Sequence, residues 1–345
     1  MINNIILNIN ATLKEALVKL DANVEIQTLF IEENNKIVGT ITDGDIRRGL
    51  INGLGNNNSL AEFMNINFTF LNKGKYEKEK LDFIKEKKLK ILPVLDENGV
   101  LSRIINFNKV KTILPIDAVI MAGGVGSRLM PLTENTPKPM LKIGGKPIME
   151  YNVDLLKSYG ISHLTLSVNY LANIIEDYYK DGSEKEMHIS YITENEPLGT
   201  IGAVKQIKQF HNDYILVMNS DLLTNINLEA MFKELVSNNA DMIIATTDYK
   251  VQIPYGVVES DCNKVTGLKE KPTYTYYSNA GIYIFKKEMV NFIPQNTHFN
   301  ATDLLEKGIA ENKKILHFPI TDYWLDIGKH IDFEKAQKDI KNIKF

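Results

Sequence analysis

Apolar runs and their spacing divide the chain near residue 115. Beyond that point, near-continuous apolar runs predict buried strands, and amphipathic stretches predict helices between them. The strands are expected at 118–121, 163–170, 187–192, 214–221, 242–247 and 280–285, and the helices at 147–159, 171–180, 201–210 and 228–238. This alternation predicts an α/β domain with a mostly parallel sheet, whose ligands bind beyond the carboxyl ends of the strands.

The first third of the chain contains a weak internal repeat. Residues 29–50 (LFIEENNKIVGTITDGDIRRGL) align with residues 93–114 (PVLDENGVLSRIINFNKVKTIL) at an offset of 64. Each copy predicts a helix, a strand, a short turn, a second strand and the polar start of another helix. Thr12 and Glu15 have the capping-box spacing that begins a helix. Because such units cannot bury their apolar faces alone, we expect the two copies to pack together.

A run of charges occupies residues 73–90 (KGKYEKEKLDFIKEKKLK). A solvated helix with Leu81 and Ile84 turned inward explains it better than a binding tail does. Pro115 then ends the repeat, and a new apolar strand follows. We therefore expect a first unit over residues 1–114, with its copies at about 1–55 and 56–114, and a second unit over 115–345.

Composition excludes several classes of protein. The 345 residues include 40 basic and 43 acidic side chains, and the net charge of −3 does not suit a strongly basic nucleic-acid binder. No apolar run approaches the roughly 20 residues that cross a bilayer, and the N-terminus lacks the features of a signal peptide. Cys262 is the only cysteine, so we expect a reducing, cytoplasmic setting. The scattered histidines argue against a zinc site.

The repeat resembles a tandem pair of CBS domains, a regulatory module that binds adenine nucleotides in many proteins. In the first copy, GTITDGDI carries the nucleotide-contact pattern of that family at Gly39, Thr42 and Asp45. The resemblance implies that Asp45 accepts hydrogen bonds from ribose hydroxyls and that Thr42 lies near a phosphate. At most one site is complete, because the equivalent residues of the second copy are Arg103, Asn106 and Lys109. The alternative is a pair that only mediates dimerisation. By either reading we expect a homo-oligomer.

A glycine-rich stretch follows the first strand of the second unit: MAGGVGSRLMPLTENTPKPM, residues 121–140. The N–H groups of Gly123, Gly124 and Gly126 can approach a phosphate or a base closely. The stretch lacks the Gly-Lys-Ser/Thr end of a Walker loop. Prolines at 131, 137 and 139 exclude the long helix that a dinucleotide-binding loop needs. An NAD-dependent oxidoreductase is therefore disfavoured.

The same stretch carries two cations. Arg128 and Lys138 can neutralise the charge of a triphosphate, and the prolines on either side of Lys138 restrict the backbone that carries it. The alternative is an exposed loop with incidental charges, and the spacing of the whole stretch argues against it.

Residues 121–150 (MAGGVGSRLMPLTENTPKPMLKIGGKPIME) resemble the signature of the sugar-phosphate nucleotidyltransferases. Further blocks resemble that family in the same order: ENEPLGTIGAV (194–204), NSDLL (219–223), YGVV (255–258), KEKP (269–272), SNAGIYIF (278–285) and WLDIG (324–328). The resemblance covers the chain from residue 116 onwards and implies a Rossmann-like domain. It also implies that a sugar-1-phosphate oxygen attacks the α-phosphorus of a nucleoside triphosphate and that pyrophosphate leaves, with no general base.

The resemblance implies a role for each motif residue. Arg128, Lys138, Asp221 and Lys271 would be catalytic. Asp221 and Asp326 would hold Mg²⁺, which takes oxygen ligands and shares them with phosphates. The nucleotide would be bound by Ala122, Gly123, Gly124, Gly126, Ser127, Glu194, Pro197, Gly199 and Thr200. The sugar phosphate would be bound by Gly256, Glu270, Lys271 and Asn279. Taken alone, an aspartate could be a cap, Glu270 and Lys271 a surface ion pair and Asn279 a turn residue.

Glu194 stands where many of these relatives carry a glutamine that reads the base. A carboxylate only accepts hydrogen bonds, which suits the N1–H and N2–H₂ donors of guanine, and backbone groups are the alternative readers. LSVNYLANIIEDYY and ITENEPLGT, with the N-terminal repeat, resemble guanylyltransferases of bacterial nonulosonate (legionaminic-acid-type) pathways, which act on glucosamine-1-phosphate. Mannose-1-phosphate guanylyltransferases are close neighbours. A non-catalytic, nucleotide-sensing homologue is a further alternative, but every motif cation and aspartate is present.

Overall fold

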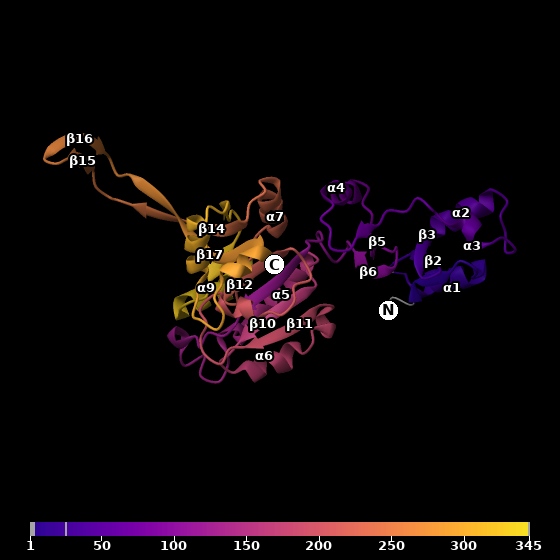
Figure 1. Ribbon diagram of the computed structural model, residues 1–345, viewed down its shortest axis with the longest axis horizontal. Helices are drawn as coiled ribbons and strands as arrows, with labels where there is room; N and C mark the ends of the chain where they lie inside the picture. Colours follow the sequence, from indigo (N-terminus) through magenta and orange to yellow (C-terminus); the bar gives the residue numbers. More distant parts are fainter. Residues whose placement is uncertain (1–3, 25, 344–345) are drawn as a thin grey trace. The chain divides into compact units, whose positions relative to one another are not determined.

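The computed structural model describes residues 4–24 and 26–343 (Figure 1). The chain forms two compact units, one up to Ile113 and one from Leu114 onwards. Each unit has a hydrophobic core of its own. Within the described residues, every helix is too short or too polar to span a membrane.

The first unit contains two three-stranded sheets with the orders β1-β2-β3 and β4-β5-β6. In each sheet the antiparallel hairpin is the one that the internal repeat predicts, whereas the first strand, which pairs in parallel with the hairpin, was not predicted. The strands are β1 (Ile6–Asn8), β2 (Thr28–Glu33), β3 (Lys36–Thr42), β4 (Leu71–Asn72), β5 (Ile91–Leu95) and β6 (Leu101–Asn106). The helices are α1 (Leu13–Ala22), α2 (Asp43–Ile51), α3 (Leu60–Phe63) and α4 (Lys78–Glu86).

Local sequence signals account for the elements of the first copy. Thr12 and Glu15 form the expected capping box: the Glu15 N–H donates to Thr12 Oγ1 at 3.2 Å, and the Thr12 N–H donates to Glu15 Oε2 at 2.7 Å. Asn34 and Asn35 form the turn between β2 and β3 with φ values of 51° and 62°. Asparagine tolerates this left-handed backbone, so the two-residue hairpin follows from its sequence.

One hydrophobic cluster joins the two copies, and the second copy has a further cluster of its own. Leu95 of the second copy is buried in the cluster that the first copy builds, and Ile91, Leu101 and Ile104 pack against the same cluster. The expected packing of the copies against each other is confirmed. In α4, Leu81 is buried among apolar side chains of the second copy, as the charge run predicts.

One element of the second copy differs from the expectation. A turn over residues 107–109 follows β6, so the expected start of a helix is wrong. Asn106 Oδ1 accepts a hydrogen bond from the Asn108 N–H at 2.9 Å, and the Asn106 carbonyl accepts one from the Lys109 N–H at 2.9 Å. Such local bonds from an asparagine side chain compete with helix formation.

The second unit is built on a seven-stranded sheet with the order β11-β10-β7-β12-β17-β14-β18. Strands β11, β10, β7 and β12 are parallel, and β17 runs antiparallel to both of its neighbours. The strands are β7 (Ile116–Met121), β10 (His163–Val168), β11 (His188–Thr193), β12 (Tyr214–Asn219), β14 (Met242–Gln252), β17 (Thr273–Lys286) and β18 (Ile315–Pro319). The α/β class with a mostly parallel sheet is confirmed.

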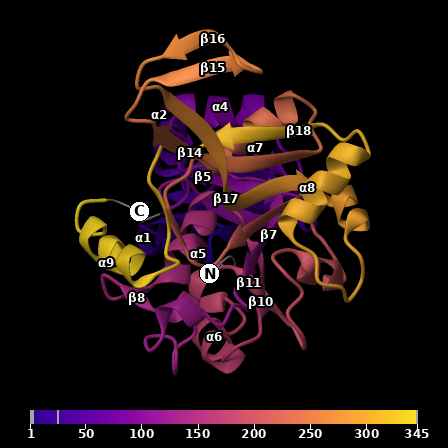
Figure 2. The same cartoon turned by 90° about the vertical axis from the view of Figure 1, so that its left-hand side faces the viewer.

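Helices pack around this sheet. Figure 2 shows α6 beside β11 and β10, and α9 beside β8. The helices are α5 (Ile148–Ser158), α6 (Ala172–Tyr179), α7 (Leu228–Ser237), α8 (Ala301–Ala310) and α9 (His330–Asp339), with 3-10 helices η2 (Ser127–Leu129), η3 (Lys138–Met140), η4 (Ser183–Lys185), η5 (Gly202–Gln206) and η6 (Lys287–Phe292). Three small sheets pair β8 (Lys142–Ile143) with β9 (Lys146–Pro147), β13 (Leu222–Thr224) with β19 (Trp324–Asp326), and β15 (Val257–Asp261) with β16 (Lys264–Lys269).

The helix expected over 201–210 is wrong, because only the 3-10 helix η5 forms there. The N–H groups of Ile201 and Gly202 both donate to the Phe299 carbonyl, at 3.2 and 3.1 Å. A tertiary contact therefore takes the donors at the start of the segment. The amphipathic pattern gives no sign of this partner, which lies almost a hundred residues away in the chain.

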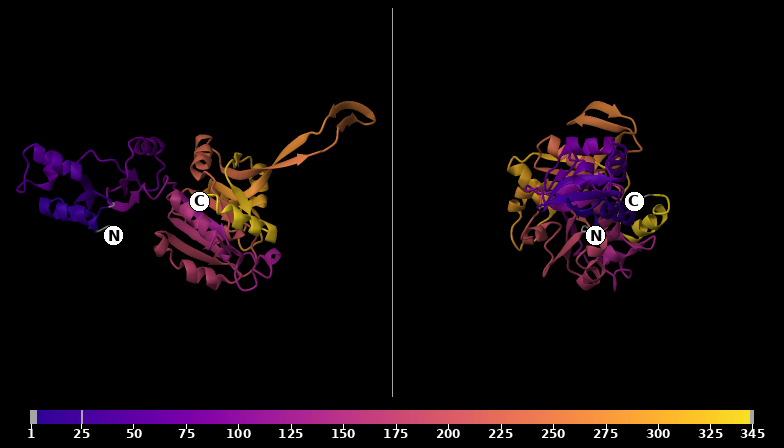
Figure 3. Two further views of the ribbon diagram at one scale, coloured as in Figure 1. Left: turned by 180° about the vertical axis from the view of Figure 1, so that it is seen from behind. Right: turned by 90° about the vertical axis from the view of Figure 1, so that its right-hand side faces the viewer.

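The outer halves of β14 and β17 leave the sheet as a two-stranded ribbon. The β15–β16 hairpin lies at its far end, away from the remaining strands (Figures 1 and 3). Residues 242–246 of β14 are buried or nearly so, whereas 248–252 are exposed. We call residues 247–278 the arm. The apolar run of 280–285 marks only the inner part of β17, which is why the sequence shows nothing of the arm.

Candidate active site

Three predicted site segments, and a fourth segment that the sequence did not single out, follow the carboxyl ends of the four parallel strands. Gly123 follows β7, Asn169 follows β10, Glu194 follows β11 and Asp221 follows β12. Carboxyl ends of parallel strands meet at one edge of a sheet, which is where ligands of such folds bind. The topology therefore gathers segments that are about a hundred residues apart in the sequence.

Lys138 and Asp221 form an ion pair at this edge. The side chains are only 10% and 20% exposed, so the pair is largely removed from water. Pro137 is the N-cap of η3 and Pro139 lies within its first turn, so both fix the backbone at Lys138. The structure brings together the cation and the carboxylate that the sequence predicted in separate motifs.

Asp326 lies beside this pair. Leu222, the residue after Asp221, is paired with Asp326 in the β13–β19 sheet, and the Ile327 N–H donates to the Asp221 carbonyl at 3.0 Å. Partial burial first, and the charge of Asp221 second, raise the pKa of Asp326, while Lys138 and Arg128 oppose the rise. Two cations and a second carboxylate therefore lie close enough to Asp326 to influence its pKa.

Arg128 completes the cluster. A methyl group placed on Gly328 would lie 3.6 Å from Asp326 Oδ1 and 3.8 Å from both terminal nitrogens of Arg128. The arginine and the aspartate therefore face the same space beside Gly328. Two cations and two carboxylates converge here, as charge stabilisation of a reacting phosphate requires.

The donor set fits a hard divalent cation. Asp221 Oδ1 is buried and has no hydrogen-bond partner among the described residues, an arrangement that is costly for a carboxylate unless a ligand completes it. No group of three or more His, Cys, Asp or Glu side chains suited to a metal occurs in that part of the chain. Mg²⁺ commonly takes one or two carboxylates and obtains its other ligands from water and substrate phosphates. Asp221 and Asp326 would supply two such carboxylates.

The glycine-rich loop is held against Lys138. Gly126 has a φ of 68°, and a methyl group on it would lie 2.9 Å from Lys138 Cβ. Thr133 Oγ1 donates to the Gly126 carbonyl at 2.9 Å, and the Ala122 N–H donates to the Ser167 carbonyl at 2.7 Å. Ser127 begins η2, a single 3-10 turn, so no long helix follows the glycines.

Gly126→Ala tests this close approach. A side chain at a left-handed position that also overlaps Lys138 should lower the free energy of unfolding by about 2 kcal/mol and displace the lysine. Gly124 is the matched control, since a methyl group there meets nothing within 4 Å. Urea denaturation measures the stability of both variants. Equal stability of Gly126→Ala and Gly124→Ala would contradict the close contact between Gly126 and Lys138.

Glu194 is buried and both of its carboxylate oxygens have partners in the chain. Ser167 Oγ donates to Oε1, the Leu198 N–H donates to Oε2 at 2.8 Å, and Asn169 Nδ2 donates to the Glu194 carbonyl at 2.6 Å. Oε1 also faces Gly123, because a methyl group there would lie 3.1 Å away. The carboxylate thus ties the ends of β10 and β11 to the loop before Leu198. The sequence did not single out Ser167 and Asn169, although the block LSVNY contains both.

Glu194→Ala should therefore reduce stability as well as any base preference. Removing the carboxylate leaves the Ser167 hydroxyl and the Leu198 N–H without their acceptor, and the free energy of unfolding should fall by about 2 kcal/mol. Thermal and urea denaturation measure the change. Glu196→Ala, at an exposed position two residues on, should stay within about 0.5 kcal/mol of the unchanged protein. Equal stability of the two variants would refute the structural role.

The rest of the predicted nucleotide segment is fixed to α8. Gly199 has a φ of 77°, and a methyl group there would lie 2.7 Å from the Phe299 carbonyl oxygen. Thr200 Oγ1 accepts a hydrogen bond from the Ala301 N–H at 2.9 Å. Pro197 is exposed at the surface. The contacts of these residues with a base and a ribose stay predictions.

The predicted sugar-phosphate residues do not join the cluster. Gly256, Glu270 and Lys271 lie on the arm, where a methyl group on Gly256 would be 3.1 Å from Glu270 Oε2. Asn279 lies at the base of the arm and uses its side chain there: Oδ1 accepts the Gly281 N–H at 2.9 Å, and Nδ2 donates to the Tyr283 hydroxyl at 2.7 Å.

In the first unit, Thr42 and Asp45 contact each other. Thr42 Oγ1 and the Thr42 N–H both donate to Asp45 Oδ2, at 2.6 and 2.8 Å, and form a capping box at the start of α2. Arg48 Nη2 donates to Asp45 Oδ1 at 2.6 Å. The carboxylate predicted to bind a ribose thus holds a helix start and pairs with an arginine.

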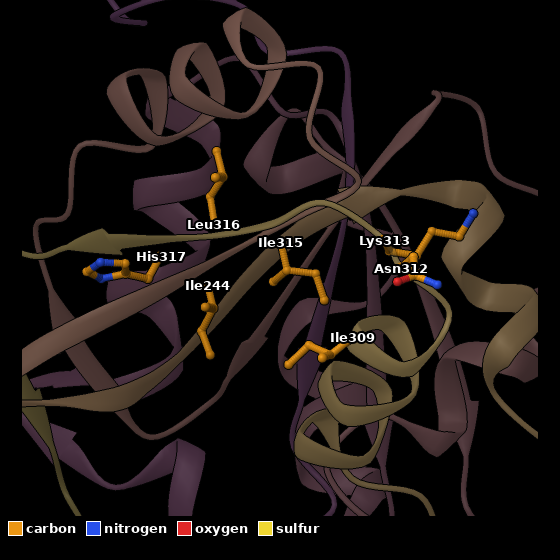
Figure 4. Close-up of a pocket in the computed structure, with 7 residues that line it drawn as sticks. All are labelled: Ile244, Ile309, Asn312, Lys313, Ile315, Leu316 and His317. Carbon is orange, nitrogen blue, oxygen red and sulfur yellow. The ribbon is translucent and has the colours of Figure 1, made fainter.

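Two cavities lie away from this cluster. One, of about 490 Å³, is lined by residues of β14, β18 and the end of α8 (Figure 4): Ile244, Ile309, Asn312, Lys313, Ile315, Leu316 and His317. The other, of about 510 Å³, lies at the amino ends of β7, β10 and β11. His163 stacks there between His211 at 3.9 Å and His188 at 5.2 Å. Neither cavity is lined by Lys138 or Asp221.

Comparison with known proteins decides the family. The model of the nucleotidyl transferase family matches residues 117–343, and the model of the CBS domain matches residues 1–52. The chain belongs to the nucleotidyl transferase family. The family match covers every residue of the charged cluster, and the CBS match covers Thr42 and Asp45.

Several curated members of the family are similar to this chain. D-glycero-alpha-D-manno-heptose 1-phosphate guanylyltransferase of Aneurinibacillus thermoaerophilus is 33% identical, over 66% of this chain and 99% of its own length. Mannose-1-phosphate guanylyltransferase of Mycobacterium tuberculosis and UTP–glucose-1-phosphate uridylyltransferase of Synechocystis are each 31% identical, over 65% and 66% of this chain. The chain spans 64% and 65% of the length of these two relatives.

Solved structures show the same fold. HddC from Yersinia pseudotuberculosis, complexed with GMP-PN, is 28% identical over 65% of this chain and 99% of its own, with a TM-score of 0.50. A putative glucose-1-phosphate thymidylyltransferase from Bacillus anthracis, at 21% identity, covers 67% of this chain and 97% of its own, with a TM-score of 0.55. The predicted nucleotidyltransferase fold is confirmed.

Proposed function

We propose that this protein transfers a nucleotidyl group from a nucleoside triphosphate, GTP, to a sugar-1-phosphate and releases pyrophosphate. The observation that carries the proposal is the convergence of Arg128, Lys138, Asp221 and Asp326 beside the glycine-rich loop at the carboxyl edge of the sheet. Membership of the nucleotidyl transferase family, and relatives that act on sugar phosphates, support it.

The chemistry needs position and charge more than proton transfer. An oxygen of the sugar-1-phosphate forms a bond to the α-phosphorus, and the bond from that phosphorus to the bridging oxygen of pyrophosphate breaks. The nucleophile is already an anion at neutral pH, so no general base takes part. Lys138 contacts the α-phosphoryl group, and Arg128 binds the departing pyrophosphate.

Mg²⁺ would be held by Asp221 and Asp326, and when bound it neutralises charge on the phosphates. The orphaned Asp221 Oδ1 is the atom of this chain that supports the assignment. Lys138 bonds to Asp221 Oδ2, the other oxygen of the same carboxylate. Asp221 would therefore hold both the lysine and the ion beside the α-phosphate. Pairing with Asp221 also fixes the Lys138 ammonium group before substrate arrives.

Guanine and glucosamine-1-phosphate are the proposed base and sugar, with the product used for cell-surface glycan or legionaminic-acid-type synthesis. Support for the base is the carboxylate at Glu194 and the two guanylyltransferases among the relatives named above. Because each Glu194 oxygen already accepts one internal bond, guanine would use remaining lone pairs. Mannose-1-phosphate is the alternative acceptor.

A panel of four nucleoside triphosphates and several sugar-1-phosphates, with pyrophosphate detection, tests the proposal. We expect turnover with GTP and glucosamine-1-phosphate that depends on added Mg²⁺. Turnover with UTP or dTTP and none with GTP would refute the base, and turnover with mannose-1-phosphate alone would refute the sugar. No turnover with any pair would favour a non-catalytic nucleotide sensor.

The first unit is proposed to be a CBS pair that binds an adenine nucleotide at Thr42 and Asp45 and regulates the enzyme. The match of the CBS family model over residues 1–52 and the shared core of the two copies support this role. A nucleotide would replace the Arg48 contact of Asp45 with a ribose. Calorimetry of the whole chain with AMP, ADP and ATP, repeated on Asp45→Ala, measures binding. A pair that only mediates dimerisation would bind none of the three.

A further inference from the structure

The segment that carries Asp326 continues past the charged cluster and contacts the glycine-rich stretch at two points. Gly328 lies beside the side chain of Arg128, since a methyl group on Gly328 would be 3.8 Å from both terminal nitrogens of that arginine. His330, the first residue of α9, comes two positions later, and its Nε2 lies 2.9 Å from the Met130 carbonyl oxygen. This histidine lies outside the motifs identified in the sequence.

The direction of the bond between His330 and Met130 follows from its chemistry. A carbonyl oxygen only accepts hydrogen bonds, so Nε2 of His330 carries the hydrogen and donates it. Neutral imidazole with its hydrogen on Nε2 and protonated imidazolium both make this bond. The bond therefore persists across the pH range in which histidine titrates, and it is a structural tie between α9 and the glycine-rich stretch.

This tie fixes the end of the turn that carries Arg128. Arg128 is the middle residue of the 3-10 helix η2, and Met130 is the C-cap of that helix. The Met130 N–H donates to the Ser127 carbonyl at 3.3 Å, which closes the turn. The Met130 carbonyl accepts from His330, so one residue is bonded both within the turn and to α9.

The other support of the turn is apolar. Leu129, the neighbour of Arg128, is fully buried and belongs to one hydrophobic cluster with Ile327 and with Ala336 of α9. Helix α9 therefore holds the turn through its buried face and through His330. Such support matters because a long side chain keeps a productive geometry only when the residues around it are fixed.

We propose that His330 is a positioning residue for Arg128, whose guanidinium it keeps in place for binding the departing pyrophosphate. The inference rests on the proposed nucleotidyl transfer. Without the bond from His330, the burial of Leu129 still anchors the turn, but the end of the turn at Met130 is released. A displacement of about 1 Å costs up to about 100-fold in rate, so a partial loss of support should cost about 10-fold.

His330→Ala in the whole chain tests the proposal. The kcat of nucleotidyl transfer should fall about 10-fold, and the KM for pyrophosphate in the reverse reaction should rise by a similar factor. The KM for the sugar-1-phosphate should not change, because Arg128 is assigned to the pyrophosphate and not to the sugar phosphate. His330→Gln keeps an N–H donor on the side chain and should recover most of the lost rate.

A double-mutant cycle separates the positioning of Arg128 from a general effect on the fold. Because His330 is proposed to act through Arg128, adding His330→Ala to Arg128→Ala should lower the rate no further. Gln337→Ala is the matched control on the same helix. Gln337 Nε2 donates to the Lys142 carbonyl at 2.7 Å, and its Oε1 accepts the Gly144 N–H at 3.1 Å. This variant weakens the attachment of α9 at another point, and its kcat and both KM values should match those of the unchanged protein.

Equal kinetics of His330→Ala and the unchanged protein would overturn the proposal. Additive losses in the cycle with Arg128→Ala would do the same. A loss in Gln337→Ala as large as that in His330→Ala would show that only the general attachment of α9 matters, which also overturns it. Inactivity of the unchanged chain with every substrate pair would instead refute the proposed function, and this inference with it.

Discussion

Asp221→Asn should reduce the rate of nucleotidyl transfer by at least about 100-fold. The substitution keeps the shape of the side chain but removes its charge, so Lys138 loses its ion-pair partner and the cation site loses one of two carboxylates. Steady-state pyrophosphate release at saturating GTP and sugar phosphate measures the loss. The backbone contact between the Asp221 carbonyl and the Ile327 N–H is unaffected, so the β13–β19 sheet should stay folded.

Asp213→Asn is the control for this variant. Asp213 forms an ion pair with Lys287 on the surface before β12, and it is exposed. Exposed ion pairs contribute little, so its turnover and melting temperature should match those of the unchanged protein. An Asp221→Asn enzyme that turns over as fast as Asp213→Asn would remove Asp221 from the reaction centre. A circular-dichroism spectrum that matches the parent's excludes unfolding as the cause.

Asp326→Asn should combine a loss of activity with a gain in stability. The loss should again be about 100-fold or more, because the variant keeps Asp221 as its only charged cation ligand. The metal-free variant should melt at a higher temperature than its parent at pH 7. The reason is that partial burial and the charge of Asp221 raise the pKa of Asp326, so ionisation of that carboxyl opposes folding.

The gain in melting temperature should depend on pH, and its direction follows from the raised pKa of Asp326. A carboxyl with a raised pKa in the folded state favours folding while it is protonated, and that contribution is lost as the pH rises through the folded-state pKa. The difference in melting temperature should therefore be present at pH 7 and absent below about pH 4, where the parent carboxyl is protonated in both states. Asp322→Asn, at an exposed position in the preceding turn, should change neither activity nor stability. A lower melting temperature of metal-free Asp326→Asn at pH 7 would contradict the repulsion.

Much of the fold is predictable because its local signals agree with its tertiary contacts. The capping box of Thr12 and Glu15 and the Asn34–Asn35 turn depend on neighbouring residues alone, and both are observed. At the two failures the segment bonds to partners that the pattern does not show. Phe299 accepts the N–H groups of Ile201 and Gly202, and the Asn106 side chain and carbonyl accept N–H groups of the turn after β6. A residue pattern shows which face is apolar, but it does not show which distant carbonyl competes.

The sequence by itself determined which chemical groups this protein carries: two cations in a proline-restricted loop, two aspartates in separate motifs and three glycines whose N–H groups can approach a phosphate. These follow from residue type and spacing, which fix charge and backbone freedom.

The tertiary structure alone decided how those groups are arranged. It paired Lys138 with Asp221, set Asp326 beside them and buried the carboxylate of Glu194. It also placed Lys271 on the arm, between β16 and β17. Strand order and ladder register set these distances, and both arise from contacts between segments far apart in the chain, which a linear pattern does not encode.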